Sequence, residues 1–247
     1  MPGEPWTAVV AERLAVVQTR VVLAARAAGR DPASIRILAV SKSLPPEAVW
    51  AALAAGLDDI GENYVKEAGA KRRLVERGTW HLVGGLQRNK IRPALAVFDR
   101  VHSLDSVALA AGLGAELAAT GRHLPVLIQV NVGGEPSKRG VPPEQVEMLA
   151  ERVLAEVGLV LEGLMTIPPP GPSPEAARPY FRLLRELRDR AAYRLGVELP
   201  HLSMGMSDDF TVAVEEGATW LRLGRALFGA RGPGTWRPGS CAGGQGS

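Results

Sequence analysis

The sequence has little of what cross-links a chain or inserts it into a membrane. Its single cysteine, Cys241, lies in a glycine-rich end, so no disulfide can form within the chain. No apolar stretch reaches the roughly 18 residues that a bilayer span requires. Residues 1–6 lack the basic start of a signal peptide. We therefore expect a soluble, cytoplasmic protein without a membrane partner.

Long runs of one charge are also missing. The 29 basic and 26 acidic residues are interspersed, and no block of like charge suggests a nucleic-acid-binding tail. A net charge of +3 and a pI near 9.3 make the chain weakly basic, which suits an anionic small ligand as well as any other partner. We expect no nucleic-acid partner.

Several common site signatures are absent. There is no GxxxxGK[ST] loop for phosphate and no GxSxG nucleophile turn. The four histidines have no spacing typical of metal ligands, so we predict no metal site and expect them to be structural residues at strand ends. They are His81, His102, His123 and His201.

Eight short apolar runs alternate with helical patterns along the chain. The predicted strands are Ile35–Val40, Asp59–Gly61, Trp80–Val83, Arg100–His102, Val126–Asn131, Leu161–Thr166, His201–Ser203 and Trp220–Leu223. Alternation of this kind indicates parallel strands joined by helices, and eight repeats in 247 residues predict a (β/α)8 barrel. An open, doubly wound sheet is the alternative, because two of the runs are only three residues long.

The same count predicts the domain organisation. A helix over about residues 7–28 precedes the first strand, and the barrel then uses residues 1–231 without leaving a second domain. Residues 232–247 are rich in glycine and are predicted to be a flexible tail. We expect a monomer.

Lys42 is the first candidate for chemistry. The chain has only five lysines, and this one follows the apolar run 35–41 and precedes Leu44-Pro45-Pro46. A lysine that neighbours desolvate at a strand end can lose its proton and form a Schiff base with an aldehyde. A surface lysine at the start of a loop is the alternative interpretation.

A phosphate site is predicted after the last two strands. Barrels gather their sites at the carboxyl ends of the strands, often with phosphate held after strands seven and eight. Ser207 precedes a helix-start pattern there, and Gly224-Arg225 opens the last short helix. Alternatively, Ser207 is only a helix cap and Gly224 only a tight turn.

Arg222 is unusual because it lies between Leu221 and Leu223 in the last predicted strand. Its guanidinium stays charged and must find an acceptor. That acceptor is either a buried carboxylate or the ring nitrogen of a bound heterocycle.

Several segments together resemble the pyridoxal phosphate homeostasis protein family. They are Ile37–Lys42, Gly61–Val65, Trp80-His81 with Leu86–Lys90, Ile128–Asn131 with Glu135, Lys138 and Gly140, Gly163–Ile167, Leu202–Asp209 and Arg222–Gly224. The resemblance runs in order from about residue 10 to 231. It implies an alanine racemase-type barrel, pyridoxal 5′-phosphate (PLP) bound to a lysine, and a role in vitamin B6 and amino-acid balance.

The resemblance also implies roles for particular residues. Lys42 would carry the Schiff base and Arg222 would face the pyridine nitrogen. Ser207, with the backbone of Gly224 and Arg225, would hold the phosphate, and Asn63 would lie on the ring-hydroxyl side. The sequence departs from the family pattern twice: Gly85 stands where many relatives have proline, and Arg225 stands where serine or threonine is common.

Three functions follow from these residues. The first is a PLP-binding carrier or regulator without catalytic turnover, with PLP-dependent apoenzymes as possible recipients. The second is a PLP-dependent enzyme of low activity, such as an amino-acid racemase, although an arginine on the ring nitrogen makes a weak electron sink and no second base is evident. The third is a barrel that binds a phosphorylated sugar, with Lys42 acting as in aldolases.

Overall fold

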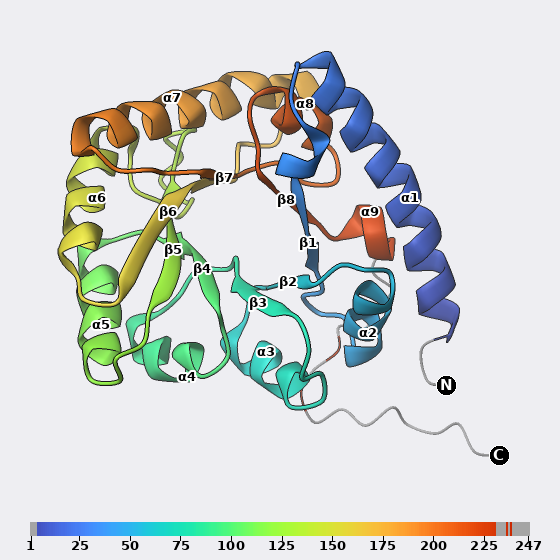
Figure 1. The fold of residues 1–247 in the computed structure, drawn as a ribbon, viewed down its shortest axis with the longest axis horizontal. Helices are drawn as coiled ribbons and strands as arrows, with labels where there is room; N and C mark the ends of the chain where they lie inside the picture. Colours follow the sequence, from blue (N-terminus) through green and yellow to red (C-terminus); the bar gives the residue numbers. More distant parts are fainter. Residues whose placement is uncertain (1–3, 231–235, 237, 239–247) are drawn as a thin grey trace.

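A closed barrel of eight parallel strands forms the centre of the protein (Figure 1). The computed structural model describes residues 4–230, 236 and 238. The strands are β1 (Arg36–Val40), β2 (Asp59–Glu62), β3 (Thr79–Leu82), β4 (Arg100–Leu104), β5 (Leu124–Val130), β6 (Leu159–Thr166), β7 (His201–Ser203) and β8 (Trp220–Leu223). Each pairs with the next, and β8 pairs with β1. The predicted (β/α)8 barrel is confirmed, and the open sheet is excluded.

Helices surround the barrel and connect its strands (Figure 1). They are α1 (Glu4–Ala27), α2 (Pro46–Ala54), α3 (Val65–Arg72), α4 (Ile91–Leu95), α5 (Val107–Ala118), α6 (Val146–Ala155), α7 (Arg178–Leu195), α8 (Phe210–Glu215) and α9 (Arg225–Phe228). Short 3-10 turns precede α4, α6 and α7, so these helices begin a few residues later than the helical patterns over residues 87–96, 143–156 and 175–195 predict. The predicted tail, residues 232–247, lies outside the described residues except for Trp236 and Pro238.

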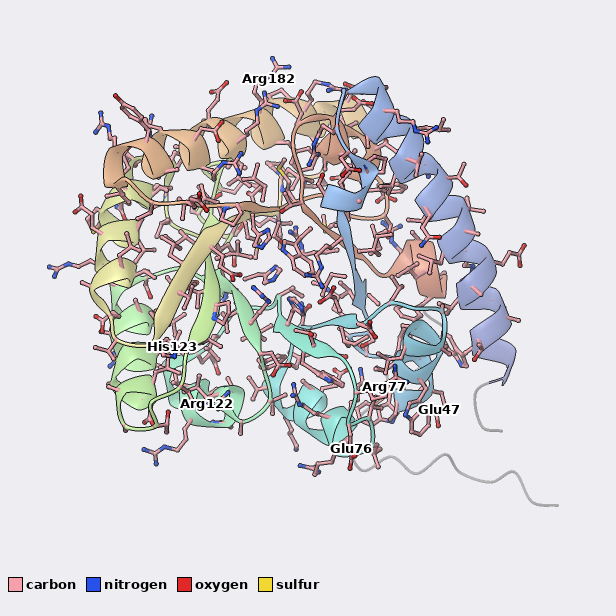
Figure 2. All side chains as sticks on the ribbon, viewed as in Figure 1. Glu47, Glu76, Arg77, Arg122, His123 and Arg182 are labelled. Carbon is pink, nitrogen blue, oxygen red and sulfur yellow. The ribbon has the colours of Figure 1, made fainter. Side chains whose placement is uncertain are left out.

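The two faces of the strands bury different side chains, as the alternation of a β-strand requires. On the outer face, Ile60, Trp80 and Leu221 belong to one large apolar core that the strands share with the helices. Inside the ring, Leu38, Val40, Val83 and Trp220 form a second, smaller cluster. Side chains fill the centre of the ring (Figure 2). The barrel is therefore a packed core and not a pore.

A glycine allows two neighbouring strands to approach closely. Gly163 in β6 has φ +154°, and a Cβ atom there would lie 1.8 Å from the backbone oxygen of His201 in β7. No side chain fits in that space, so a substitution at Gly163 would separate β6 from β7. This contact positions β7, whose last residue, Ser203, points into the barrel.

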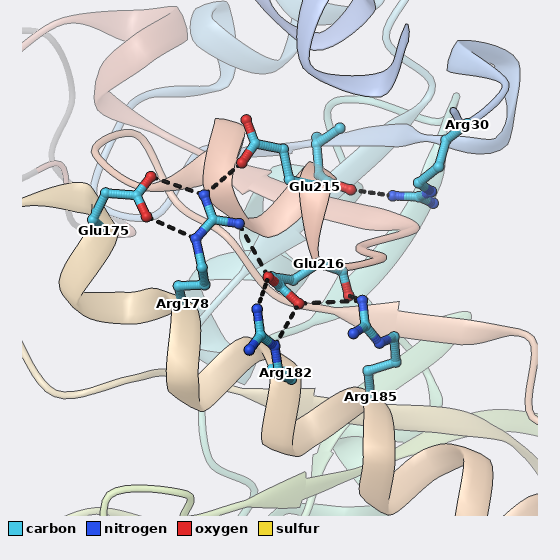
Figure 3. A network of polar contacts seen from close by, with 8 residues as sticks. Arg30, Glu175, Arg178, Arg182, Arg185, Glu215 and Glu216 are labelled. Carbon is cyan, nitrogen blue, oxygen red and sulfur yellow. Dashed lines mark hydrogen bonds and ion pairs between the residues drawn. The ribbon is translucent and has the colours of Figure 1, made fainter. Parts of the chain in front are cut away.

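An ion-pair network ties α8 to α7 on the outside (Figure 3). Glu216, directly after α8, accepts hydrogen bonds from Arg178 at 3.0 Å and Arg182 at 3.1 Å, and pairs with Arg185 at 3.2 Å. Arg178 also binds Glu215 at 2.5 Å. Because Glu216 is buried, these contacts hold α8 firmly. The network therefore anchors the helix that follows the loop with Ser207, one of the residues predicted for the phosphate site.

The described helices include none that is long and apolar enough to cross a membrane.

Candidate functional site

All six residues predicted for the site line one cavity at the carboxyl ends of the strands. The cavity has a volume of about 430 Å³. Its lining contains Lys42, Asn63, Ser207, Arg222, Gly224 and Arg225, together with Val40, Val83, Ile167, Met206, Asp208, Asp209 and Ala230. The predicted residues come from loops after strands β1, β2, β7 and β8 and from β8 itself. The closed barrel is what brings them together.

Lys42 lies in a tight turn two residues beyond the end of β1. The N–H of Leu44 donates to the carbonyl oxygen of Ser41 at 3.0 Å, which closes the turn around it. Ser43 has φ 63°, the left-handed region, and it is alone in this among the described residues other than glycine. Such a conformation costs free energy and persists only where neighbouring contacts enforce it. The turn around Lys42 is therefore held by contacts outside it.

Those contacts come from a buried cluster of three charged residues behind the turn. Lys71 of α3 is fully buried and donates to Glu62 at 2.6 Å, to Glu67 at 2.7 Å and to the carbonyl oxygen of Ser41 at 2.8 Å. Glu67 also accepts from the N–H of Ser43 at 2.5 Å. Both neighbours of the candidate lysine are thus anchored to this cluster.

Glu62 connects the cluster to the end of β2. Its Oε1 accepts from the hydroxyl of Ser41 at 2.6 Å, while its Oε2 is buried without a hydrogen-bond partner among the described residues. Burial raises the pKa of Glu62, although Lys71 opposes the shift. With two carboxylates and one lysine, the cluster has a net negative charge when all three groups are ionised. A raised pKa lets Glu62 take up a proton more readily, which reduces that charge.

Trp236 lies against the same turn from the C-terminal side. Its backbone N–H donates to the carbonyl oxygen of Ser43 at 3.1 Å, and its ring lies 5.4 Å from the ammonium nitrogen of Lys71. A cation over an indole face is an attractive contact. This part of the predicted tail therefore contacts the turn that carries Lys42.

Arg222 is buried inside the barrel, and within the described part of the chain it forms no hydrogen bond to the predicted carboxylate. It donates to the hydroxyl of Ser203 at 2.8 Å and to the carbonyl oxygen of Thr166 at 2.7 Å. Burial lowers the pKa of Arg222 to about 10, and the nearby carboxylate of Asp209 opposes this shift. The side chain stays cationic at neutral pH. Arg222 also lines the cavity, and among the described residues its remaining side-chain N–H groups have no hydrogen-bond partner.

The loops after β7 and β8 place several backbone N–H groups in the wall of the cavity. Within the described part of the chain, the N–H groups of Ser207, Asp208, Gly224 and Arg225 have no hydrogen-bond partner. The helix cap expected as the alternative for Ser207 is not formed. Its hydroxyl instead accepts from the N–H of Ala226 at 3.0 Å, which joins the two loops. Unpaired N–H groups at helix starts favour an anion such as phosphate.

Acidic side chains limit the positive charge of this region. Arg225 is exposed and ion-paired with Asp208. Asp209 accepts from the N–H of Met206 at 2.6 Å, and burial raises the pKa of its carboxyl group. Arg225 therefore contributes less positive charge to the cavity than its sequence position suggests, and Arg222 is the buried cation.

A larger cavity of about 870 Å³ adjoins the first and shares Asn63 with it. Among the described residues, four cationic side chains line it, namely Lys66, Arg73, Lys90 and Arg139. Gly85, one of the two departures from the family pattern, lies in its wall. A Cβ atom at this position would lie 2.4 Å from Nε of Arg139, so glycine leaves room for that side chain.

Two histidines are placed differently from the prediction. His81 and His102 lie within β3 and β4 and not at strand ends, and both are fully buried inside the barrel. Their ring nitrogens are 3.0 Å apart. The described residues contain no group of three or more potential metal ligands.

The sequence interpretation missed the cluster of Glu62, Glu67 and Lys71. Its only sequence signal is the spacing of Glu67 and Lys71, which four residues place on one face of a helix. That spacing predicts an exposed pair as readily as a buried one. Asp208 and Asp209 form the helix-start pattern after Ser207, and that pattern does not indicate that both carboxylates lie in the cavity wall.

Comparison with known proteins gives consistent matches. The family model described as alanine racemase, N-terminal domain, matches residues 17–232. The pyridoxal phosphate homeostasis protein of Pseudomonas aeruginosa is 48% identical over 90% of this chain and 96% of its own length. That of Aquifex aeolicus is 44% identical over 89% and 97%.

Solved structures agree with these relatives. Structures of PipY from Synechococcus elongatus, without PLP and with PLP bound, match with TM-scores of 0.80 and 0.78 at 37% and 35% identity. Each match covers 89% of this chain and all of that one. The barrel and its cavity thus define a protein of the alanine racemase N-terminal domain class. Within this class, the chain belongs to the pyridoxal phosphate homeostasis protein family.

Proposed function

We propose that this protein binds pyridoxal 5′-phosphate in the cavity of about 430 Å³ and serves intracellular PLP and amino-acid homeostasis. The observation that carries the proposal is the convergence of an amine, a buried guanidinium and unpaired backbone N–H groups on that one cavity. PLP has an aldehyde, a ring nitrogen and a phosphate, so each of these three groups has a chemically matched partner. The family and the PLP-bound PipY structure support the same ligand.

Each residue has a separate task in this proposal. Lys42 would hold the cofactor covalently through its amine, and the buried cluster around Lys71 holds the turn in position for it. Arg222 donates to the ring nitrogen, and its charge keeps that nitrogen unprotonated. Ser207, Gly224 and Arg225 receive the phosphate mainly through backbone N–H groups, and Asn63 faces the ring hydroxyl. When bound, PLP supplies an electrophilic aldehyde and a conjugated ring.

The cavity favours holding over turnover. Proton transfer on both faces of an amino-acid adduct requires a second acid or base opposite Lys42. Of the carboxylates in the described lining, Asp208 is paired with Arg225 and Asp209 is bound by the N–H of Met206. Neither is free for that role. We therefore infer a carrier or regulator of PLP, and the racemase-like alternative requires deuterium from solvent to appear at Cα of an amino acid.

We propose that the protein works in the cytoplasm as a monomer and that PLP-dependent apoenzymes are its recipients. A monomer leaves the cavity mouth accessible to a recipient, and Lys42 is only partly buried. Light scattering of the loaded protein tests the monomer. Transfer of PLP to a purified apoenzyme, followed by its recovered activity, tests the recipient.

Borohydride trapping tests the site. We expect the purified protein to absorb near 420 nm, about where lysine-bound PLP absorbs, and borohydride to fix the cofactor on the peptide that contains Lys42. Lys42→Ala should lose this band and the labelled peptide while keeping its circular dichroism. Lys90→Ala, which removes an exposed lysine from the adjoining cavity, should behave like the wild type.

Two outcomes would overturn the proposal. A Lys42→Ala protein that keeps the full absorbance would show that another residue holds the cofactor. A colourless wild type that takes up no added PLP would remove PLP altogether. The phosphorylated-sugar barrel would then be the better explanation of the same lysine and phosphate loops.

A further inference from the structure

A continuous row of hydrogen bonds crosses the inside of the barrel, starting from Arg222. Arg222 donates to the hydroxyl oxygen of Ser203 at 2.8 Å. That hydroxyl lies 2.9 Å from Nδ1 of His102. Nε2 of His102 lies 3.0 Å from Nδ1 of His81. Four neighbouring groups are thus linked without a gap, and three of them play no part in the proposed function.

The row ends on a carboxylate at the opposite end of the barrel. Nε2 of His81 lies 3.1 Å from Oδ1 of Asp59, the first residue of β2. Asp59 also pairs with Arg36 at 2.9 Å. With Asp58, these two residues line a cavity of about 580 Å³ beside the starts of β1 and β2. The row therefore links the two ends of the barrel through its core.

The chemistry of the end groups fixes the direction of every bond in the row. An ionised Asp59 can only accept, so His81 carries its hydrogen on Nε2 and its Nδ1 is an acceptor. His102 must then donate from Nε2, which leaves its Nδ1 to accept from the hydroxyl of Ser203. Arg222 can only donate, and Ser203 accepts from it. All five groups are satisfied when every hydrogen points from Arg222 toward Asp59.

The surroundings favour these protonation states. Burial lowers the pKa of His81, and burial lowers the pKa of His102 well below its usual value, so both rings are neutral. Burial alone would raise the pKa of Asp59, but the hydrogen bond from His81 and the charge of Arg36 hold it below its ordinary value. The ring of Trp220 packs 4.9 Å from that of His81 and 5.9 Å from that of His102. This packing holds the two imidazoles in place.

We propose that Asp59 is a remote positioning residue for Arg222. Its fixed negative charge selects the tautomer of both histidines and directs a lone pair of Ser203 at the guanidinium. The two bonds to Ser203 and Thr166 then hold Arg222 with its other N–H groups toward the cavity. This inference rests on the proposed function only in so far as those N–H groups meet the ring nitrogen of PLP.

A donor in place of the Asp59 carboxylate would reverse the row. His81 would then carry its hydrogen on Nδ1 and donate to His102, and His102 would donate from Nδ1 to Ser203. The hydroxyl oxygen of Ser203 would accept from His102 and Arg222 together, with its own hydrogen left without this partner. Arg222 would share its acceptor and lose part of its orientation. The tautomers of the histidines thus report the state of the whole row.

Nitrogen NMR of the ligand-free protein tests the row directly. The chain has four histidines, so ¹⁵N-histidine labelling gives few signals, and His81→Gln and His102→Gln assign the two that matter. We expect both to be neutral at pH 7.5, with the hydrogen on Nε2 and a bare Nδ1. A hydrogen on Nδ1 of either ring, or a doubly protonated ring, would overturn the proposal.

Asp59→Asn tests the effect on Arg222, with Asp58→Asn as the matched control on the neighbouring exposed carboxylate. In Asp59→Asn we expect a changed tautomer at His81 and His102. We also expect a shift in the pH midpoint of the absorbance of bound PLP. The dissociation constant for PLP should rise about 3- to 10-fold, the range for weakening one charge-assisted hydrogen bond. Asp58→Asn should stay within about twofold on that scale. If the two variants behave alike, Asp59 does not position Arg222.

Arg36→Gln separates the row from the ion pair. It removes the other partner of Asp59 and keeps the carboxylate, so the histidine tautomers should stay as in the wild type. If Arg36→Gln reproduces every effect of Asp59→Asn, the ion pair and not the row is responsible. Should Asp59→Asn fail to fold, Ser203→Ala interrupts the row in the middle and must change the same absorbance midpoint.

The NMR experiment and the PLP-binding experiment together distinguish a failure of this proposal from a failure of the proposed function. The NMR experiment uses no cofactor and remains decisive even if the wild type binds no PLP. If PLP is trapped on Lys42 but Asp59→Asn leaves tautomers, midpoint and affinity unchanged, only the positioning role fails.

Discussion

The inner and outer faces of the same eight strands differ in what they bury. On the outer face, Trp80 and Leu221 pack into one apolar core with the helices. On the inner face, their immediate neighbours His81 and Arg222 belong to a polar row that leads to the cavity. Adjacent residues of one strand thus face the apolar core on one side and the polar row on the other. A change on one face should therefore leave the other largely intact.

The largest effect on stability is expected on the outer face. Phe181 of α7 is fully buried in the outer core, and Phe181→Ala should lower the free energy of unfolding by about 4 kcal/mol through lost burial and a residual cavity. Urea unfolding measures this. Tyr193→Ala on the same helix, where the side chain is 89% exposed, should change stability by less than about 0.5 kcal/mol. A similar loss in both variants would contradict the comparison.

The charged cluster behind Lys42 lies between helix and strand, and a change there should affect both the stability of the fold and the capture of PLP. Lys71→Met leaves Glu62 and Glu67 without their shared cation, which should cost about 3 kcal/mol, near the lower end for a broken buried ion pair. It should also slow PLP capture because Ser41 and Ser43 lose their anchors. Urea unfolding and stopped-flow absorbance measure the two effects.

Lys66→Met provides the control for Lys71, since it removes an exposed lysine from the same helix. We expect unchanged stability and capture rate. The loss in Lys71→Met should shrink at acid pH, because the raised pKa of Glu62 lets that carboxyl take up a proton. A loss that is equal at pH 5 and pH 8 would argue against a charge effect.

The smallest effect on stability is expected from the titration of His201, on the inner face of the barrel. Burial lowers the pKa of His201 to about 4, against 6.5 for an unperturbed histidine. Between these values the unfolded state binds more protons, so the free energy of unfolding falls as the pH drops from about 6.5 toward 4. Above 6.5 the residue is neutral in both states and contributes no pH dependence.

Replacing His201 should reduce the loss of stability at acid pH. We expect His201→Gln to retain more of its urea midpoint between pH 6.5 and pH 4 than the wild type does. His123→Gln removes an exposed histidine and should follow the wild-type curve. Parallel curves for His201→Gln and the wild type would show that His201 does not contribute.

The fold could be predicted from the sequence because the outer faces of the strands leave a readable signal. Apolar runs such as Ile35–Val40 mark strands, and helical patterns between them fix the parallel connections. Helix starts are harder to predict: the helical pattern over residues 208–216 begins two residues before α8, because the turn there uses Asp209 to bind the N–H of Met206. That contact is local but depends on a geometry that the pattern does not specify.

The inner face was harder to predict because its contacts depend on strand register. Nothing in the sequence near Arg222 indicates that Ser203 and Thr166 are its partners, since they lie 19 and 56 residues away. His81 and His102 meet for the same reason. The six candidate residues, by contrast, all come from strand ends or β8, and the closed ring brings such positions to one rim whatever the register.

Trp220 gives the protein a built-in optical reporter. It is one of five tryptophans, is almost completely buried inside the ring, and lies on the same face of β8 as Arg222, roughly 7 Å away along the strand. A ligand held against Arg222 that absorbs in the range of tryptophan emission should quench the emission of Trp220 by energy transfer over this short separation. Loading and release can therefore be followed in real time without a label, and Trp220→Phe identifies the part of the signal that comes from inside the barrel.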